Sequence, residues 1–345
     1  MRISRSSVSA SALLATVVSI LLTPSPGSAQ TTGAKATASP SASKPGSAAT
    51  SGNPRDLQGV WSFLTVTPLQ RPKEFADKDV LSPEEKAKLE EQATRDQFVD
   101  RPPAPGETGA YNKFWIETGT KVVKTGRTSL IVDPPDGRVP PLTPQGKTRA
   151  DALERRGKTA AGPEDMTTWD RCLVGFNAGP PMIGGGYNAN VQIFQTRDHV
   201  VLLNEMVHDA RIIPLDGRPF GTIRQWRGES RARWEGDTLV VETKNFRSEG
   251  TGTLSLRAMG VTGDENLHLI ERFKRLDNTT LLYEYTINDP TVWARPWTVS
   301  MTMDKSDQQL YEYACHEGNY AMRNMLTGAR VREKNEVAAA ESPAR

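Results

Sequence analysis

The sequence has little cysteine, little histidine and no excess of charge of one sign. Of its 345 residues two are cysteine and four are histidine, and 43 Lys and Arg stand against 41 Asp and Glu. Four of the basic residues and no acid fall in 1–53, which leaves 39 basic against 41 acidic residues, a net charge of −2, for the rest. Such a chain lacks the basic surplus typical of nucleic-acid binders, so we expect no nucleic acid as a partner.

Long apolar runs are also scarce: one, from about 10 to 22, stands out. Arg2 and Arg5 precede it and the small residues 27–29 follow it, an order typical of a secretory signal peptide, which we predict at 1–29. An uncleaved anchor is the alternative, but the run is shorter than the roughly 20 residues of a membrane helix. Residues 30–53 are rich in Ala, Ser and Pro and predict a disordered linker. We therefore expect a secreted or periplasmic protein with no membrane span after cleavage.

Export determines what the two cysteines are expected to do. In an oxidising compartment a lone pair of cysteines usually forms a disulfide, so we predict a bond between Cys172 and Cys315. The alternative treats Cys315, which precedes His316 and Glu317, as a nucleophile or a metal ligand.

From residue 189 onward, short apolar segments alternate with turns rich in Gly, Asn and Asp. In 281–287 and 297–303 the odd-numbered residues are all apolar or aromatic. Strands with one buried apolar face and one solvent-exposed polar face indicate an antiparallel sheet. We expect its strands to include 222–226 and, as the last, 309–315. Closure into a barrel is favoured because it removes exposed edges.

Two resemblances support this prediction. Gly59, Val60 and Trp61, at the start of the first predicted strand, resemble the lipocalin-like barrels, in which the Trp plugs one end and a small ligand occupies the other. A large family of uncharacterised proteins secreted by environmental bacteria is similar over most of 56–335; the strings that carry this resemblance are 127–138, 208–219, 233–243 and 311–320. The second resemblance implies a shared fold and export but no activity.

The predicted fold is mainly β: an antiparallel lipocalin-like β-barrel as a single domain over 54–335. A helical and loop insertion at 72–170 follows the first strand. Within it, Ser82, Pro83 and Glu85 form a helix start, so we expect a helix from 83 to about 97 and a second from 144 to about 156. Residues 336–345 are expected to be a disordered tail.

The histidines are the first candidates for chemistry. His208, His268 and His316 lie in or beside predicted strands, and three imidazoles facing one hollow could bind a divalent metal. No other cofactor is indicated. In the metal-free alternative, His208 and His316 act as acid and base, assisted by Glu242 or Asp289, whose pKa values we expect burial to raise. The alternative for these two acids is a structural role, in which each forms a salt bridge with an arginine.

Aromatic and basic side chains near these positions predict a binding wall for a small, partly apolar or aromatic molecule. The arginines would hold an anionic group, although the rings could equally fill the barrel. The predicted substrate-binding residues are Tyr187, Asn188, Arg211, Trp293, Arg295 and Tyr313.

The function predicted from the sequence is that of a secreted or periplasmic barrel enzyme, a hydrolase, lyase or isomerase that uses histidine and carboxylate acid-base chemistry. A non-catalytic lipocalin-like carrier of a hydrophobic ligand is the alternative. A surface interaction module on a flexible tether is the third class, and it predicts no deep cavity.

Overall fold

The computed structural model describes residues 53–97, 117, 119–247 and 265–341. The predicted signal peptide at 1–29, and all of the predicted linker except its last residue, lie outside the described residues. Among the helices of the described part, none combines the length and apolar character that a membrane crossing requires.

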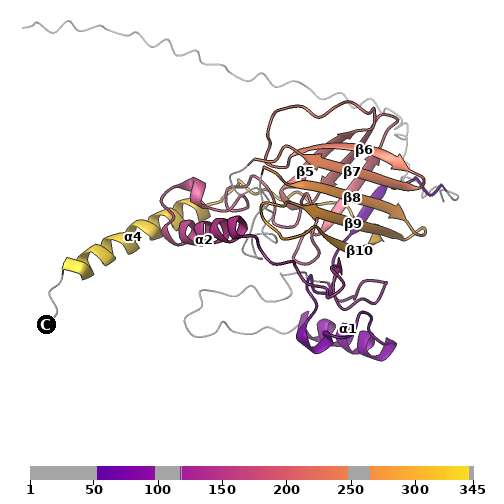
Figure 1. The fold of residues 1–345 in the computed structure, drawn as a ribbon, viewed down its shortest axis with the longest axis horizontal. Helices are drawn as coiled ribbons and strands as arrows, with labels where there is room; N and C mark the ends of the chain where they lie inside the picture. Colours follow the sequence, from indigo (N-terminus) through magenta and orange to yellow (C-terminus); the bar gives the residue numbers. More distant parts are fainter. Residues whose placement is uncertain (1–52, 98–116, 118, 248–264, 342–345) are drawn as a thin grey trace, which may run out of the picture. The chain divides into compact units, whose positions relative to one another are not determined.

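Within these described residues, ten antiparallel strands form one sheet (Figure 1). In chain order they are β1 Gly59–Ser62, β2 Ile131–Asp133, β3 Asn190–Gln195, β4 His199–Asn204, β5 Asp209–Pro214, β6 Glu229–Glu235, β7 Thr238–Lys244, β8 His268–Arg275, β9 Thr280–Asn288 and β10 Trp297–Ser306. Their order across the sheet is β5-β4-β3-β1-β10-β9-β8-β7-β6, and β2 pairs separately with β10. The strands β3 to β5 form one meander and β6 to β10 form the other. β1 joins the two meanders by pairing with β3 on one side and β10 on the other. The predicted antiparallel, mainly β architecture is confirmed.

Hydrogen bonds do not close this sheet into a barrel. Its end strands, β5 and β6, lie side by side, but no ladder joins them. Side chains occupy the gap instead, among them the ion pair between Asp209, which begins β5, and Arg227, which precedes β6. We call this gap between β5 and β6 the seam. The predicted closure is therefore not found.

Two of the predicted strands are wrong. Residues 309–315 form no strand, because both edges of β10 are already paired, one with β1 and the other with β9. Residues 222–226 are largely exposed and irregular, apart from a single bridge between Gln225 and Phe246. An alternating sequence becomes a strand only where a ladder edge is free to satisfy its backbone groups.

The helices lie outside the sheet (Figure 1). In the described residues they are α1 Pro83–Gln97, α2 Pro144–Thr159 and α4 Ala321–Glu341, with short 3-10 turns η1 Lys73–Phe75, η2 Pro163–Asp165 and η3 Met206–His208. The predicted start of α1 is confirmed: Ser82 N donates to Glu85 Oε2 at 2.6 Å, and Glu85 N donates to Ser82 Oγ at 3.2 Å. The predicted insertion at 72–170 contributes β2 to the sheet. The predicted disordered tail starts at 336, but α4 continues to Glu341, so the first residues of that tail are helical.

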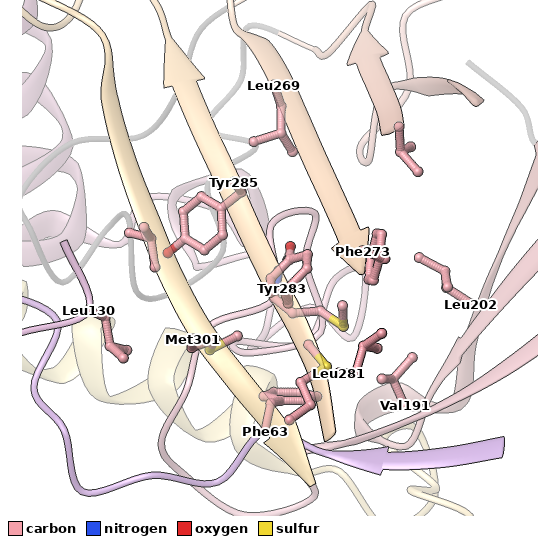
Figure 2. Packing of buried hydrophobic residues seen from close by; sticks show 14 of the residues in the cluster. Phe63, Leu130, Val191, Leu202, Leu269, Phe273, Leu281, Tyr283, Tyr285 and Met301 are labelled. Atoms are coloured by element: carbon pink, nitrogen blue, oxygen red, sulfur yellow. The ribbon is translucent and has the colours of Figure 1, made fainter. Parts of the chain in front are cut away.

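The core gathers on the inward face of the sheet, as Figure 2 shows. The ring of Tyr283 on β9 lies 4.8 Å from that of Phe273 on β8 and 5.6 Å from that of Tyr285. Val191 and Leu202, from the other meander, are fully buried in the same cluster. The alternation read from 281–287 thus marks the face that packs against both meanders.

One charged residue lies within this apolar cluster. Glu271 on β8 is 0% exposed, between the inward-facing Leu269 and Phe273. Arg211 reaches it from β5 and donates twice, Nη1 to Oε2 at 2.7 Å and Nη2 to Oε1 at 2.9 Å. Tyr283 Oη also donates to Glu271 Oε1, at 2.7 Å. Burial, reinforced by the Glu271 charge, raises the pKa of Tyr283, so its phenol stays a donor.

We expect Glu271→Gln to lower the free energy of unfolding by about 3–5 kcal/mol, because it leaves the buried Arg211 guanidinium without its counter-charge. Denaturant unfolding followed by circular dichroism measures this. Glu284→Gln on the outward face of β9 is the matched control and should cost less than about 0.5 kcal/mol. Equal stability of the two variants would show that the buried pair does not hold the fold.

Candidate functional site

The two predicted catalytic histidines do not form an acid-base pair with a carboxylate. His208 ends η3 in the left-handed backbone region, with φ 52°, and its side chain is exposed. His316 is exposed in the irregular segment after β10. Within the described part of the chain, neither imidazole makes a hydrogen bond or an ion pair with an acid. The geometry of a general base oriented by a carboxylate is therefore lacking at both positions.

The predicted metal set of His208, His268 and His316 is likewise not assembled. No three His, Cys, Asp or Glu side chains among the described residues come together in a group able to hold a metal ion. His268 instead lies on the outward face of β8, where its Nε2 is 2.8 Å from Glu242 Oε1.

Glu242 lies on the outward face of β7 and contacts two basic side chains. Its Oε1 is 2.6 Å from Lys244 Nζ as well as close to His268. Partial burial acts to raise the pKa of Glu242, but the hydrogen bond and charge of Lys244, with those of His268, outweigh it and hold the pKa below its ordinary value. The predicted rise is wrong, because a half-buried outward position leaves the carboxylate within reach of cations.

Three other predicted residues have structural contacts. Asp289 is buried and accepts hydrogen bonds from Thr291 N at 3.1 Å and Thr291 Oγ1 at 2.6 Å, which fixes the turn after β9. Trp293 is a core residue, packed edge-on against Trp297 with ring centroids 5.7 Å apart. Arg295 is exposed and donates to Asp133 at 2.8 Å. None of the three lines the cavities described below.

Two predicted binding residues, Tyr187 and Tyr313, do share a cavity. It has a volume of about 550 Å³ and lies between the loops around 169 and 187 and the segment after β10. We call it the aromatic cavity; its lining residues are Trp169, Asp170, Tyr187, Glu312, Tyr313, Ala314, Cys315, Glu317, Gly318, Asn319 and Ala321. This size lies within the range of small-molecule sites.

Aromatic rings build one wall of the aromatic cavity. Tyr187 stacks on Tyr313 with centroids 6.3 Å apart, and Phe176 packs edge-on against both Tyr187 and Trp169, at 5.3 and 5.5 Å. Glycine is required at 186, because a Cβ there would lie 2.5 Å from the Phe176 ring. The predicted residue Asn188 does not line the cavity; with φ 52° it turns the chain beside Tyr187. The rings are thus held by one another and by local backbone geometry.

The opposite wall depends on the disulfide. The predicted bond between Cys172 and Cys315 is confirmed, so the alternative of a reactive Cys315 thiol is wrong. Asn319 Nδ2 donates to Cys172 Sγ at 3.2 Å, and Tyr311 N donates to the buried Glu205 Oε1 at 3.2 Å. These contacts position the segment 311–320, which has no strand partner.

The charge of the aromatic cavity is negative. Asp170, Glu312 and Glu317 line it, and none of its lining residues is Lys, Arg or His. Asp170 Oδ2 accepts hydrogen bonds from Thr167 N and Oγ1, at 3.1 and 2.7 Å. Glu312 and Glu317 are exposed and have no hydrogen-bond or ionic partner among the described residues. Their carboxylates therefore remain available to a ligand.

Several of these residues carry no signal of their own in the sequence. No motif points to Trp169 or Asn319, and Glu317 stands out only as the residue after His316. The signal that could have found them is the predicted disulfide, since it brings the sequence around 172 next to the sequence around 315.

Comparisons with known proteins add nothing to this geometry: no family model, no curated protein and no solved structure matches the chain.

Glu242→Gln should lower stability by less than about 1 kcal/mol at neutral pH, as for other partly exposed ion pairs. Because the folded pKa of Glu242 is lowered from 4.5, its contribution is fully present above that value and is lost as the pH falls through the folded pKa. Thermal unfolding of both proteins at about pH 7 and about pH 3 should show the difference shrinking in acid. A difference that grows in acid would contradict the lowered pKa.

Replacement of both cysteines by serine should release the segment 311–320 and lower the free energy of unfolding. The bond spans 143 residues, and a loop of that length contributes about 4–5 kcal/mol in the chain-entropy model. Hydrogen exchange read by mass spectrometry should show protection lost in 311–320 and retained in β10. Equal protection of 311–320 in both proteins would show that other contacts hold this wall.

Proposed function

We propose that the protein is a non-catalytic binding protein of the secreted or periplasmic compartment that captures a small organic cation in the aromatic cavity. One observation carries the proposal: aromatic rings and two unpartnered carboxylates share a cavity of about 550 Å³ whose lining contains no basic side chain. Ring faces attract cations through their quadrupole, and carboxylates add direct charge attraction. An anionic ligand would be repelled by the same wall.

Export is part of this proposal. The predicted signal peptide and the disulfide between Cys172 and Cys315 both suit an oxidising compartment outside the cytoplasm. A ligand-binding protein there needs no catalytic group, which agrees with the exposed positions of His208 and His316.

The lipocalin-like carrier is the nearest alternative, and it differs in where the ligand lies. A lipocalin-like barrel holds its ligand inside the sheet, where this chain places Phe273, Tyr283, Tyr285 and their neighbours in mutual contact. The aromatic cavity lies instead among loops and the segment after β10. The predicted histidine and carboxylate acid-base enzyme has less support, because that chemistry requires an oriented histidine.

Isothermal titration with benzyltrimethylammonium, and with benzyl alcohol as the uncharged comparison, tests the proposal. We expect the cation to bind and the alcohol to bind at least about tenfold more weakly, because the charge interacts with both the rings and the acids. The double variant Glu312→Gln/Glu317→Gln should weaken cation binding about tenfold, and Tyr313→Ala should do so by a similar factor.

Glu336→Gln is the matched control. This glutamate is exposed on α4 and does not line the aromatic cavity, so the change removes one surface carboxylate without altering the wall. Cation binding should be unchanged in this variant. Equal affinity for cation and alcohol, or equal loss in Glu336→Gln and the double variant, would overturn the proposal.

A further inference from the structure

A second cavity lies in the seam, where the sheet remains open. It has a volume of about 360 Å³. Its walls come from β5, from the connection between β5 and β6, and from the start of β6. Four arginines line it, namely Arg211, Arg218, Arg227 and Arg231, against a single acid, Glu229.

Carboxylates outside the cavity lining hold three of these four arginines. Arg211 pairs with Glu271, Arg227 with Asp209 and Arg218 with Asp216, and none of these three acids lines the cavity. Arg231 pairs with Glu229, which itself lines the cavity, and its nitrogens also donate to the backbone oxygens of Arg218, Pro219 and Ser230. Each guanidinium has five N–H donors in a fixed plane, so one acid positions each of the other three arginines and leaves some of their donors available.

Arg211 is the most buried of the four arginines. Its side chain is 5% exposed, and both terminal nitrogens donate to Glu271, yet its Nε has no hydrogen-bond partner. A buried donor left unpaired is costly, and Arg211 Nε is one such donor in a residue that lines the cavity.

A peptide strand is not a suitable occupant of the seam. Inserting a strand between β5 and β6 needs about 9.5 Å between them, twice the usual strand spacing. Cα atoms of β5 and β6 approach within 8 Å of each other. A compact ligand fits the cavity where an added strand does not.

We propose that the seam is a second binding site, one for a small oxyanion such as phosphate or a carboxylate, separate from the aromatic cavity. Planar guanidinium donors match the paired oxygens of both groups. Opening of the sheet between β5 and β6 is what exposes these donors, so the site exists because the ladder is missing there.

Titration of the full chain with inorganic phosphate, and separately with acetate, tests the site. We expect binding of at least one of the two. Arg231→Gln and Arg227→Gln should each weaken it about tenfold or more, the usual effect of losing one charge-assisted hydrogen bond. Arg231→Lys keeps the charge without the fork of donors and should recover only part of the affinity.

Arg233→Gln is the matched control. Arg233 lies on β6, as Arg231 does, but it is paired with Glu235 and does not line the cavity. It removes the same charge and should leave binding unchanged. Thermal unfolding checks that each variant is folded. If neither anion binds the intact protein at millimolar concentration, or if Arg233→Gln loses as much affinity as Arg231→Gln, the seam is not an oxyanion site. Neither result bears on cation binding in the aromatic cavity.

Discussion

The buried ion pair between Arg211 and Glu271 connects the two meanders across the interior of the sheet. Arg211 belongs to β5, at one end of the sheet, and Glu271 to β8, near the other. Because no ladder joins β5 to β6, this pair provides a connection that backbone hydrogen bonds do not. An unpaired charge at either position would be strongly unfavourable in an apolar core, so the two residues require each other.

Tyr283 connects the same ion pair to the loops by hydrogen bonds. Tyr283 Oη donates to Glu271 and accepts a hydrogen bond from Met182 N at 3.0 Å. Met182 belongs to the loop that leads to Tyr187, so the position of the aromatic wall depends on a polar contact in the core. A packed interior and a binding surface are therefore built by one continuous set of contacts.

Both cavities that we interpret lie at the margins of the sheet. Inside it, aromatic and aliphatic side chains contact one another, and the rigidity of that cluster positions what surrounds it. The aromatic cavity needs the disulfide because its second wall follows β10, where no strand edge remains. The cavity in the seam exists because no hydrogen-bonded ladder joins β5 to β6. In each case the place where regular pairing stops is the place where side chains become available to a ligand.

Local sequence determined much of the fold. Period-two alternation in 281–287 and 297–303 predicted β9 and β10 and the burial of their odd-numbered residues, and the same parity separated His268 from Glu271. The predicted solvent-exposed face of β10 is wrong, because Ser300 and Thr302 are buried as well. Ser82 and Glu85 predicted the start of α1, since a capping box is satisfied within one turn of chain. Cysteine number and the leader predicted the disulfide.

Tertiary structure alone decided the rest. Residues 309–315 alternate like a strand, but whether they pair depends on β1, about 250 residues earlier, which already occupies the edge of β10. Glu242 and Glu271 both lie in strands with buried apolar residues, yet one lies beside His268 of the neighbouring strand and the other accepts from Arg211. The charge state and role of a carboxylate depend on the partners that the fold brings to it, and a linear pattern contains no record of those long-range contacts.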